Sequence, residues 1–126
     1  MAAVVPRLKR RSEFLRIAGG GQKWAAPGLV LQVRERQAGM PTSDDLPPIR
    51  VGFTTSRKVG NAVARNRARR RLRAAADKIL PAMAREGFDF VIIGRAATLK
   101  RTFDDLVKDL KTALKRLDAC RKDISD

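Results

Sequence analysis

The side chains with the clearest chemical potential form one run of positive charge. Between Arg57 and Arg73 the sequence carries eight basic residues and no acidic one. Helices of soluble proteins usually interleave charges of both signs, because like charges one turn apart repel each other. Arginine also binds phosphate through paired hydrogen bonds and stacks on bases. The run therefore predicts a surface for a polyanion, with nucleic acid as the first candidate and an anionic membrane surface as the second.

Positive charge dominates the chain but is concentrated in its first part. The 126 residues include 28 Lys+Arg and 13 Asp+Glu, which gives a formal net charge of +15. Residues 1–76 hold 17 of the basic and 4 of the acidic side chains. A second basic cluster precedes the long run and consists of Arg7, Lys9, Arg10 and Arg11. With 44% hydrophobic residues the chain can also bury one modest core, so residues 1–126 are expected to form a single domain.

The groups that most often catalyse reactions in proteins are scarce. The sequence has no histidine, which removes the commonest general acid–base and the commonest metal ligand. Its carboxylates are scattered without a metal-binding spacing, and no glycine-rich loop leads into a Lys-Ser or Lys-Thr phosphate signature. We therefore expect no catalytic residue, no metal site and no cofactor held by the protein alone. If the protein takes part in a reaction, another component must carry the catalysis.

The cysteine content and the hydropathy pattern indicate a cytoplasmic protein without a membrane partner. The single cysteine, Cys120, cannot form an internal disulfide, which suits a reducing compartment. The first residues have only a short apolar run before Pro6, too small for the core of a signal peptide. The longest uncharged stretch, residues 24–33, is well below the ~18 residues needed to span a bilayer.

Hydrophobic periodicity predicts a small α+β domain around one mixed sheet, in the order helix, strands, helix, strand, helix. The first helix is predicted to begin at an N-cap, Ser12, and to end at three consecutive glycines. The last helix is predicted to follow an N-cap at Thr102, with apolar residues at the spacing of a core-facing stripe. Strands are predicted at residues 29–34, 49–56 and 88–95. Flexible segments are predicted at residues 1–6, 37–48 and about 119–126.

The first two predicted strands are expected to give the sheet one polar face. In residues 29–34, buried-type side chains alternate with Val30, Gln32 and Arg34. Residues 49–56 alternate in the same way, and Thr54 falls on the more polar side. The sheet is therefore predicted to have an apolar face for the core and a more polar, arginine-bearing face that is left open.

The long basic run is predicted to be a helix with charge around a thin apolar line. Asn61 is the predicted N-cap, and the helix is expected to run to about Leu80, before Pro81. Arginines cover most of the circumference, so that both flanks of the helix could contact RNA. Because few base-reading side chains accompany them, contact with phosphates is expected to outweigh sequence reading. Mostly small apolar residues at helical spacing form the predicted docking line: Ala64, Ala68, Leu72, Ala75 and Ile79.

Three segments of the chain resemble the bacterial ribonuclease P protein family. The most specific is RVGFTTSRKVGNAVARNRARRRLRAAADKILP, in which Arg65-Asn66-Arg67 follows Val59-Gly60 by six residues. The segment RLKRRSEF precedes it at Arg7–Phe14, and FDFVIIGRAAT follows it at Phe88–Thr98. Their order matches the family over nearly the whole chain, with the weakest similarity in residues 19–48 and after Leu117.

The resemblance implies the accessory protein subunit of an RNA-based endonuclease. In that family a catalytic RNA, working with Mg²⁺, removes the 5′ leader of precursor tRNA, and the protein binds both RNAs. It also implies a left-handed βαβ crossover, like that of the second domain of the fifth small-subunit ribosomal protein. The leader cleft is implied to include Phe14, Val30, Gln32 and Thr54. RNA-binding roles are implied for a further set: Arg57, Lys58, Gly60, Asn61, Arg65, Asn66, Arg67, Arg69, Arg70 and Arg73.

The chain departs from the family pattern at two positions of the implied cleft. Gln32 and Ala18 stand where relatives often have aromatic residues. Because base stacking contributes roughly 1–3 kcal/mol per base, leader affinity is expected to depend more on charge and hydrogen bonds here.

Two other classes of function share some of these sequence features. A structural RNA-binding protein, such as a ribosomal protein, would have the same basic surface and the same lack of catalytic groups. A membrane-surface helix is less favoured, because the apolar stripe of the basic helix is narrow and lacks aromatic residues. No obligate protein partner is expected.

Overall fold

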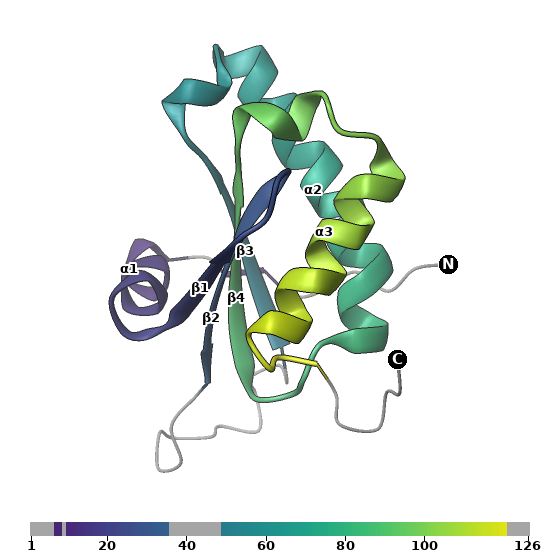
Figure 1. The fold of residues 1–126 in the computed structure, drawn as a ribbon. Helices are drawn as coiled ribbons and strands as arrows, with labels where there is room; N and C mark the ends of the chain where they lie inside the picture. The colour runs from purple at the N-terminus through teal and green to yellow at the C-terminus, as the bar shows by residue number, and fades with distance from the viewer. Residues whose placement is uncertain (1–6, 9, 36–48, 121–126) are drawn as a thin grey trace.

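The computed structural model of the protein describes residues 7–8, 10–35 and 49–120 (Figure 1). The predicted flexible segments of residues 1–6 and 37–48 lie outside these described residues, as do residues 121–126. Within the described part of the chain, no helix is both long enough and apolar enough to cross a membrane.

One mixed sheet of four strands forms the centre of the fold. Its strands lie in the spatial order β1-β2-β4-β3. β2 pairs antiparallel with both β1 and β4, whereas β3 pairs parallel with β4. The long helix α2 connects β3 to β4, so these elements form a crossover unit, which the resemblance predicts to be left-handed. The strands are β1 (Gln22–Ala25), β2 (Leu29–Glu35), β3 (Ile49–Thr55) and β4 (Phe88–Gly94).

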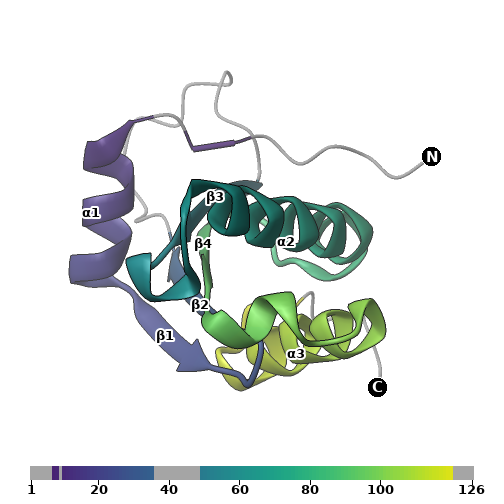
Figure 2. The same ribbon diagram turned by 90° about the horizontal axis from the view of Figure 1, so that it is seen from above.

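Helices cover the two faces of the sheet unequally (Figure 2). Helices α2 and α3 lie side by side on one face, and α1 lies on the other. The face that was predicted to be open is therefore open only in part, because α1 packs across it. The helices are α1 (Arg11–Gly20), α2 (Ala62–Met83) and α3 (Phe103–Arg116).

Each face of the sheet has its own hydrophobic cluster. The larger one fills the space between the sheet and helices α2 and α3, and includes Leu31, Leu72, Phe90 and Leu110, all fully buried. A smaller cluster lies under α1 and is formed by the buried residues Leu8, Ile17 and Val91. The alternation of β2 and β3 thus sends side chains into two separate cores rather than into one core and solvent.

The three predicted strands are confirmed to within one residue at each end. Burial in β2 alternates as predicted, with Leu29, Leu31 and Val33 on the core side. β1 was not predicted, and all four of its residues are exposed. A strand of four exposed residues has no hydrophobic period, so only its pairing with β2 identifies it.

Two predicted helix boundaries are wrong. The N-cap of α1 is Arg10, two residues before Ser12, because the Glu13 side chain accepts a hydrogen bond from the backbone N–H of Arg10 at 2.9 Å and closes the first turn there. α2 does not end at Leu80 but continues through Pro81 to Met83. Proline removes one hydrogen bond from this last turn, and the turn persists because the buried Ala84 docks on the core and donates to the Leu80 carbonyl at 2.9 Å.

The C-terminal part of the described chain follows the prediction more closely. Thr102 caps α3 by accepting from the Asp105 N–H at 3.1 Å, and the stripe on this helix is buried as expected. Ala119 is fully buried and Cys120 forms a β-bridge with Ala84. The chain is therefore packed through residue 120, slightly beyond the predicted start of the flexible tail.

Candidate nucleic-acid interface

The basic run begins in a short turn and continues into α2. A 3-10 turn, η1 (Arg57–Val59), is capped by Ser56, whose hydroxyl accepts from the Lys58 N–H at 3.0 Å. Gly60 then has φ of 140°, a backbone conformation that favours glycine. Asn61 Oδ1 accepts from the Ala64 N–H at 2.9 Å and caps α2, as predicted. The turn, the glycine and the cap together fix how the first basic side chains are presented.

The apolar line of α2 packs on the sheet as the helical spacing predicts. Ala68, Leu72 and Ala75 are fully buried, and Ala64 at the start of the line is half-buried. Arg65 and Arg71 flank this line and are also half-buried. The remaining polar side chains of the run point outward and are exposed: Arg57, Lys58, Asn61, Asn66, Arg67, Arg70 and Arg73.

Two arginines of the run are held by contacts inside the protein. Arg69 donates to the Thr55 hydroxyl at 3.3 Å and also to the Asn66 side-chain carbonyl. Arg71 donates to the backbone carbonyl of Arg101. Arg69 therefore connects α2 to the end of β3, whereas Arg71 connects it to the segment before α3.

The charge of the run is not neutralised within the described part of the protein. None of its eight basic side chains forms an ion pair with a described acidic residue. Arg50, which lies outside the run, pairs with both Asp89 and Glu13. The hydrogen bond from Arg50 to Asp89 raises the pKa of Arg50. Unlike Arg50, the basic run therefore carries positive charge that no described acidic side chain offsets.

The buried carboxylates make structural contacts. Asp109 accepts from the Gly28 N–H at 3.0 Å and pairs with Arg101 at 2.9 Å, which fixes the turn between β1 and β2 against α3. Asp89 pairs with Arg50 across β3 and β4 at 2.8 Å. No group of three or more cysteine, aspartate or glutamate side chains among the described residues is placed to hold a metal ion.

Three of the four predicted cleft residues lie on the same sheet face, as their alternation predicts. The strand register puts Val30 opposite Ile93 and Thr54 beside Ile93, so these side chains form one row across β2, β4 and β3. Gln32 lies in the next row, between Lys23 of β1 and Val91 of β4. All three predicted strand residues are half-buried.

Phe14 reaches this face from α1. Its ring and Ile93 both pack against the small cluster under the helix. Gly52 leaves the space that the ring needs, because a β-carbon added there would overlap it. Helix α1 thus brings Phe14 to the side chains from the strands, and all four predicted cleft residues share one face.

A hollow of about 530 Å³ continues from the row formed by Val30 and Ile93. Lys58 of η1 and Arg95 also line it, and both charged side chains are exposed. Sequence reasoning missed Ile93 and Arg95. The alternation of residues 88–95 could have placed Ile93 on the polar face, and Arg95 directly follows the end of that strand.

Similarity to known proteins was found in both sequence and structure. A family model described as Ribonuclease P matches residues 4–118. The chain belongs to the ribonuclease P protein family. The ribonuclease P protein component of Paramagnetospirillum magneticum is 52% identical over 122 residues, which cover 97% of this chain and 90% of that protein. The one from Ruegeria pomeroyi is 50% identical over 113 residues, covering 89% and 86%.

Solved ribonuclease P proteins have the same fold. The Thermotoga maritima protein superposes with a TM-score of 0.69 at 26% identity, covering 87% of this chain and 96% of that one. The Staphylococcus aureus protein gives a TM-score of 0.70 at 23% identity, covering 91% and 97%. The resemblance noted in the sequence is confirmed, and a ribosomal protein is not favoured.

Proposed function

We propose that the protein is the accessory subunit of a cytoplasmic ribonuclease P and assists removal of the 5′ leader from precursor tRNA. In this proposal the catalytic RNA performs the cleavage with Mg²⁺, and the protein contributes no catalytic group. The chain has no histidine, which supports a binding role.

The basic run is the surface that we assign to the catalytic RNA. Its exposed side chains carry positive charge that no described carboxylate offsets. They lie on the part of the helix circumference that faces away from the core. Phosphate contacts of this kind position an RNA without reading its sequence. Asn61 and Asn66, at the start of the helix, could in addition donate their side-chain amide N–H groups to base edges.

The sheet face beside α1 is the surface that we assign to the single-stranded leader. Val30, Phe14 and Ile93 offer apolar contact, and Gln32 and Thr54 offer hydrogen bonds to bases or riboses. Single strands bind where an apolar floor meets a positively charged margin. Lys58 and Arg95, at the hollow beyond Val30, supply such a margin.

One observation carries the proposal, namely that the two surfaces meet at Lys58. This residue lies in η1, at the start of the basic run, and also lines the hollow that begins at Val30. A precursor tRNA leader on the sheet face would therefore lie beside a catalytic RNA bound along α2. Such an arrangement gives an accessory protein a means to bring substrate and catalyst together.

Reconstitution tests this function directly. The protein is combined with the catalytic RNA of its own organism, and cleavage of leader-bearing precursor tRNA is followed at low Mg²⁺. We expect the protein to increase the cleavage rate at the mature 5′ end, with a smaller effect as Mg²⁺ rises. A protein that leaves the rate unchanged, or that copurifies with whole ribosomal subunits instead of one RNA of a few hundred nucleotides, contradicts the proposal.

A further inference from the structure

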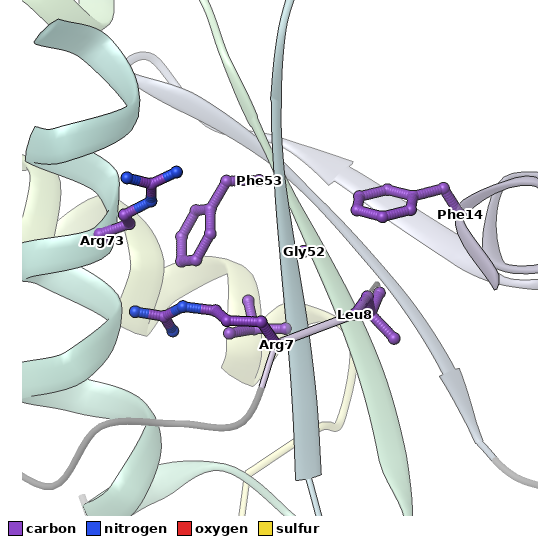
Figure 3. A pocket seen from close by; sticks show the side chains of 7 residues that line it. Arg7, Leu8, Phe14, Gly52, Phe53 and Arg73 are labelled. Atoms are coloured by element: carbon purple, nitrogen blue, oxygen red, sulfur yellow. The ribbon is translucent and has the colours of Figure 1, made fainter. Parts of the chain in front are cut away.

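A pocket of about 350 Å³ lies at the outer edge of β3, away from the hollow beside Val30. Figure 3 shows that Arg7, Phe53 and Arg73 line it on the side of α2, whereas Leu8 and Phe14 line it on the side of α1. These residues come from the N-terminal segment, from α1, from β3 and from α2. The pocket thus joins the short basic cluster near the N-terminus to the long basic run.

Two arginines approach one aromatic ring in this pocket. The guanidinium carbon of Arg7 lies 4.9 Å from the centre of the Phe53 ring, and that of Arg73 lies 5.9 Å from it. Both guanidinium groups are therefore within cation–π distance of the Phe53 ring. Phe53 itself packs against the larger hydrophobic cluster. The Phe53 ring is thus contacted by two positively charged groups from distant parts of the chain.

The carboxylate of Asp77 on α2 holds the first of these arginines. It accepts from one terminal nitrogen of Arg7 at 3.2 Å through each of its oxygens. Arg73 is exposed and forms no ion pair with a described residue. The positive charge of Arg73 is therefore the one in this pocket that no described carboxylate offsets, and an anion that reaches Arg73 beside Arg7 could form charge-assisted hydrogen bonds with it.

The backbone at this edge adds a donor. Leu8 donates its N–H to the Val51 carbonyl at 2.9 Å, so the N-terminal segment pairs with β3 at Val51. Backbone groups two residues apart on a strand point to the same edge, so the N–H of Phe53 also faces this edge, where the pocket lies. An anion at this edge could therefore also accept a hydrogen bond from the backbone.

The geometry points to a phosphodiester-binding site between Arg7 and Arg73, over Phe53. It rests on the proposed function in that the phosphodiester belongs to RNA. Arg7 was not among the residues expected to bind RNA, and this site extends the RNA surface from α2 around the edge of β3. Two arginines that share one phosphate contribute jointly, so removal of either one abolishes most of the interaction.

The test measures RNA affinity of the full-length protein for Arg7→Gln, Arg73→Gln and the double variant, at several salt concentrations. We expect each single variant to bind RNA at least about tenfold more weakly, as for removal of one charged hydrogen-bonded group. The double variant should bind little more weakly than either single one. Lys111→Gln, which removes one exposed charge from α3, is the matched control and should change affinity less than twofold. Additive effects, or an Arg7→Gln variant that behaves like the control, overturn the site.

A second pair of variants separates phosphate binding from a purely structural role of Arg7. Asp77→Asn removes the carboxylate that holds Arg7 and leaves its charge in place. If Arg7 acts only by anchoring the N-terminal segment, Asp77→Asn weakens RNA binding as much as Arg7→Gln does, and the site is refuted. If Arg7 binds phosphate, Asp77→Asn binds RNA as tightly as the wild type or more tightly. Melting temperatures of all variants show whether weaker binding comes from unfolding.

Two binding measurements assign the phosphodiester to its source. One is the affinity of the protein for the catalytic RNA alone, and the other is the ratio of precursor to mature tRNA affinity in the holoenzyme. If the variants decrease only the affinity for the catalytic RNA, the phosphodiester in the pocket belongs to the catalytic RNA. If they decrease only the ratio of precursor to mature tRNA affinity, it belongs to the leader. If neither changes, the site is wrong. A wild-type protein that binds neither RNA refutes the proposed function itself, which keeps the two failures distinct.

Discussion

The ring of Phe14 lies directly against Gly52, with no space between them for a side chain on the strand. This contact fixes how closely α1 approaches β3. It therefore also fixes the position of α1 beside the sheet face that we assign to the leader. Leu8 lies on the same side, since its Cδ1 would be 3.1 Å from a β-carbon at Gly52. The glycine is thus a requirement of packing between layers and not of backbone conformation.

Replacing Gly52 is expected to displace α1. Gly52→Ala puts a methyl group into the space of the Phe14 ring, and overpacking of this kind costs about 1–3 kcal/mol. Denaturant unfolding should show this decrease in stability, and binding of precursor tRNA should weaken because Phe14 moves. Gly19→Ala is the control, since a β-carbon at that position meets nothing within 4 Å. Equal stability of Gly52→Ala and the wild type would contradict the tight contact.

The ion pairs of Arg50 are expected to matter more for stability than surface pairs do. Arg50→Gln breaks the ion pair with Asp89, which is 8% exposed, and breaking such a buried pair costs about 3 kcal/mol. The double variant with Asp89→Asn should recover part of this stability. Arg85→Gln is the control, because Asp118 is 91% exposed and 3.9 Å away. For Arg85→Gln we expect the free energy of unfolding to decrease by about 1 kcal/mol or less.

The same interaction sets a pH dependence. Because the hydrogen bond to Asp89 raises the pKa of Arg50, this group keeps its charge at neutral and moderately alkaline pH. A raised pKa on a basic group means that its stabilising contribution is complete below the ordinary pKa and disappears only above it. The stability difference between wild type and Arg50→Gln should therefore be the same at pH 7 and pH 9. A difference that shrinks over this interval would show that Arg50 is not the group responsible.

Charge reversal on the exposed flank of α2 tests the assigned RNA surface. Arg70 is exposed and makes no ion pair with a described residue, so Arg70→Glu is expected to leave stability nearly unchanged. Affinity for the catalytic RNA should fall, and the slope of log affinity against log salt should flatten by ~0.7–0.9 for each phosphate that is no longer neutralised. Lys111→Glu on α3 controls for net charge. An unchanged slope for Arg70→Glu would mean that Arg70 contacts water and not an RNA phosphate.

An aromatic side chain at Gln32 is expected to strengthen leader binding. Gln32→Tyr adds a stacking platform beside Val91, worth on the order of 1 kcal/mol per base contacted. Precursor tRNA should then bind the holoenzyme several-fold more tightly, whereas mature tRNA, which has no leader, should bind as before. The precursor-to-mature affinity ratio at matched salt measures the effect. If both substrates change equally, or assembly with the catalytic RNA changes, the leader does not lie on this face.

The absence of catalytic side chains predicts that the isolated protein is inactive. Purified protein freed of RNA is expected not to cleave precursor tRNA at any Mg²⁺ concentration, because the sequence contains no histidine and no clustered carboxylates. Activity is measured across the chromatographic peak of the protein. Cleavage that follows this peak after complete removal of RNA would overturn the prediction.

Local patterns in the sequence determined much of the fold and part of the candidate site. Alternation in residues 29–34 placed Val30 and Gln32 on one face, because successive side chains of a strand point to opposite sides. The helical spacing of Ala68 and Leu72 likewise gave the buried line of α2. Asn61 and Thr102 were correctly predicted as caps, because a cap bonds to backbone within three residues.

Other features depend on contacts between distant segments, and only the tertiary structure decided them. β1 exists because β2 supplies its hydrogen-bond partners, and its own residues carry no periodic signal. The helix continues past Pro81 because Ala84 has a place in the core. Phe14 reaches the sheet only because Gly52, 38 positions later, has no side chain.

The pocket at the edge of β3 is the clearest example of a feature that depends on contacts between distant segments. Arg7 and Arg73 belong to two basic clusters that look independent in the sequence. They meet at Phe53 because the N-terminal segment pairs with β3 while α2 packs beside that strand. Charge and periodicity are properties of neighbouring residues, whereas the distance between two side chains far apart in the chain is set by how the layers pack.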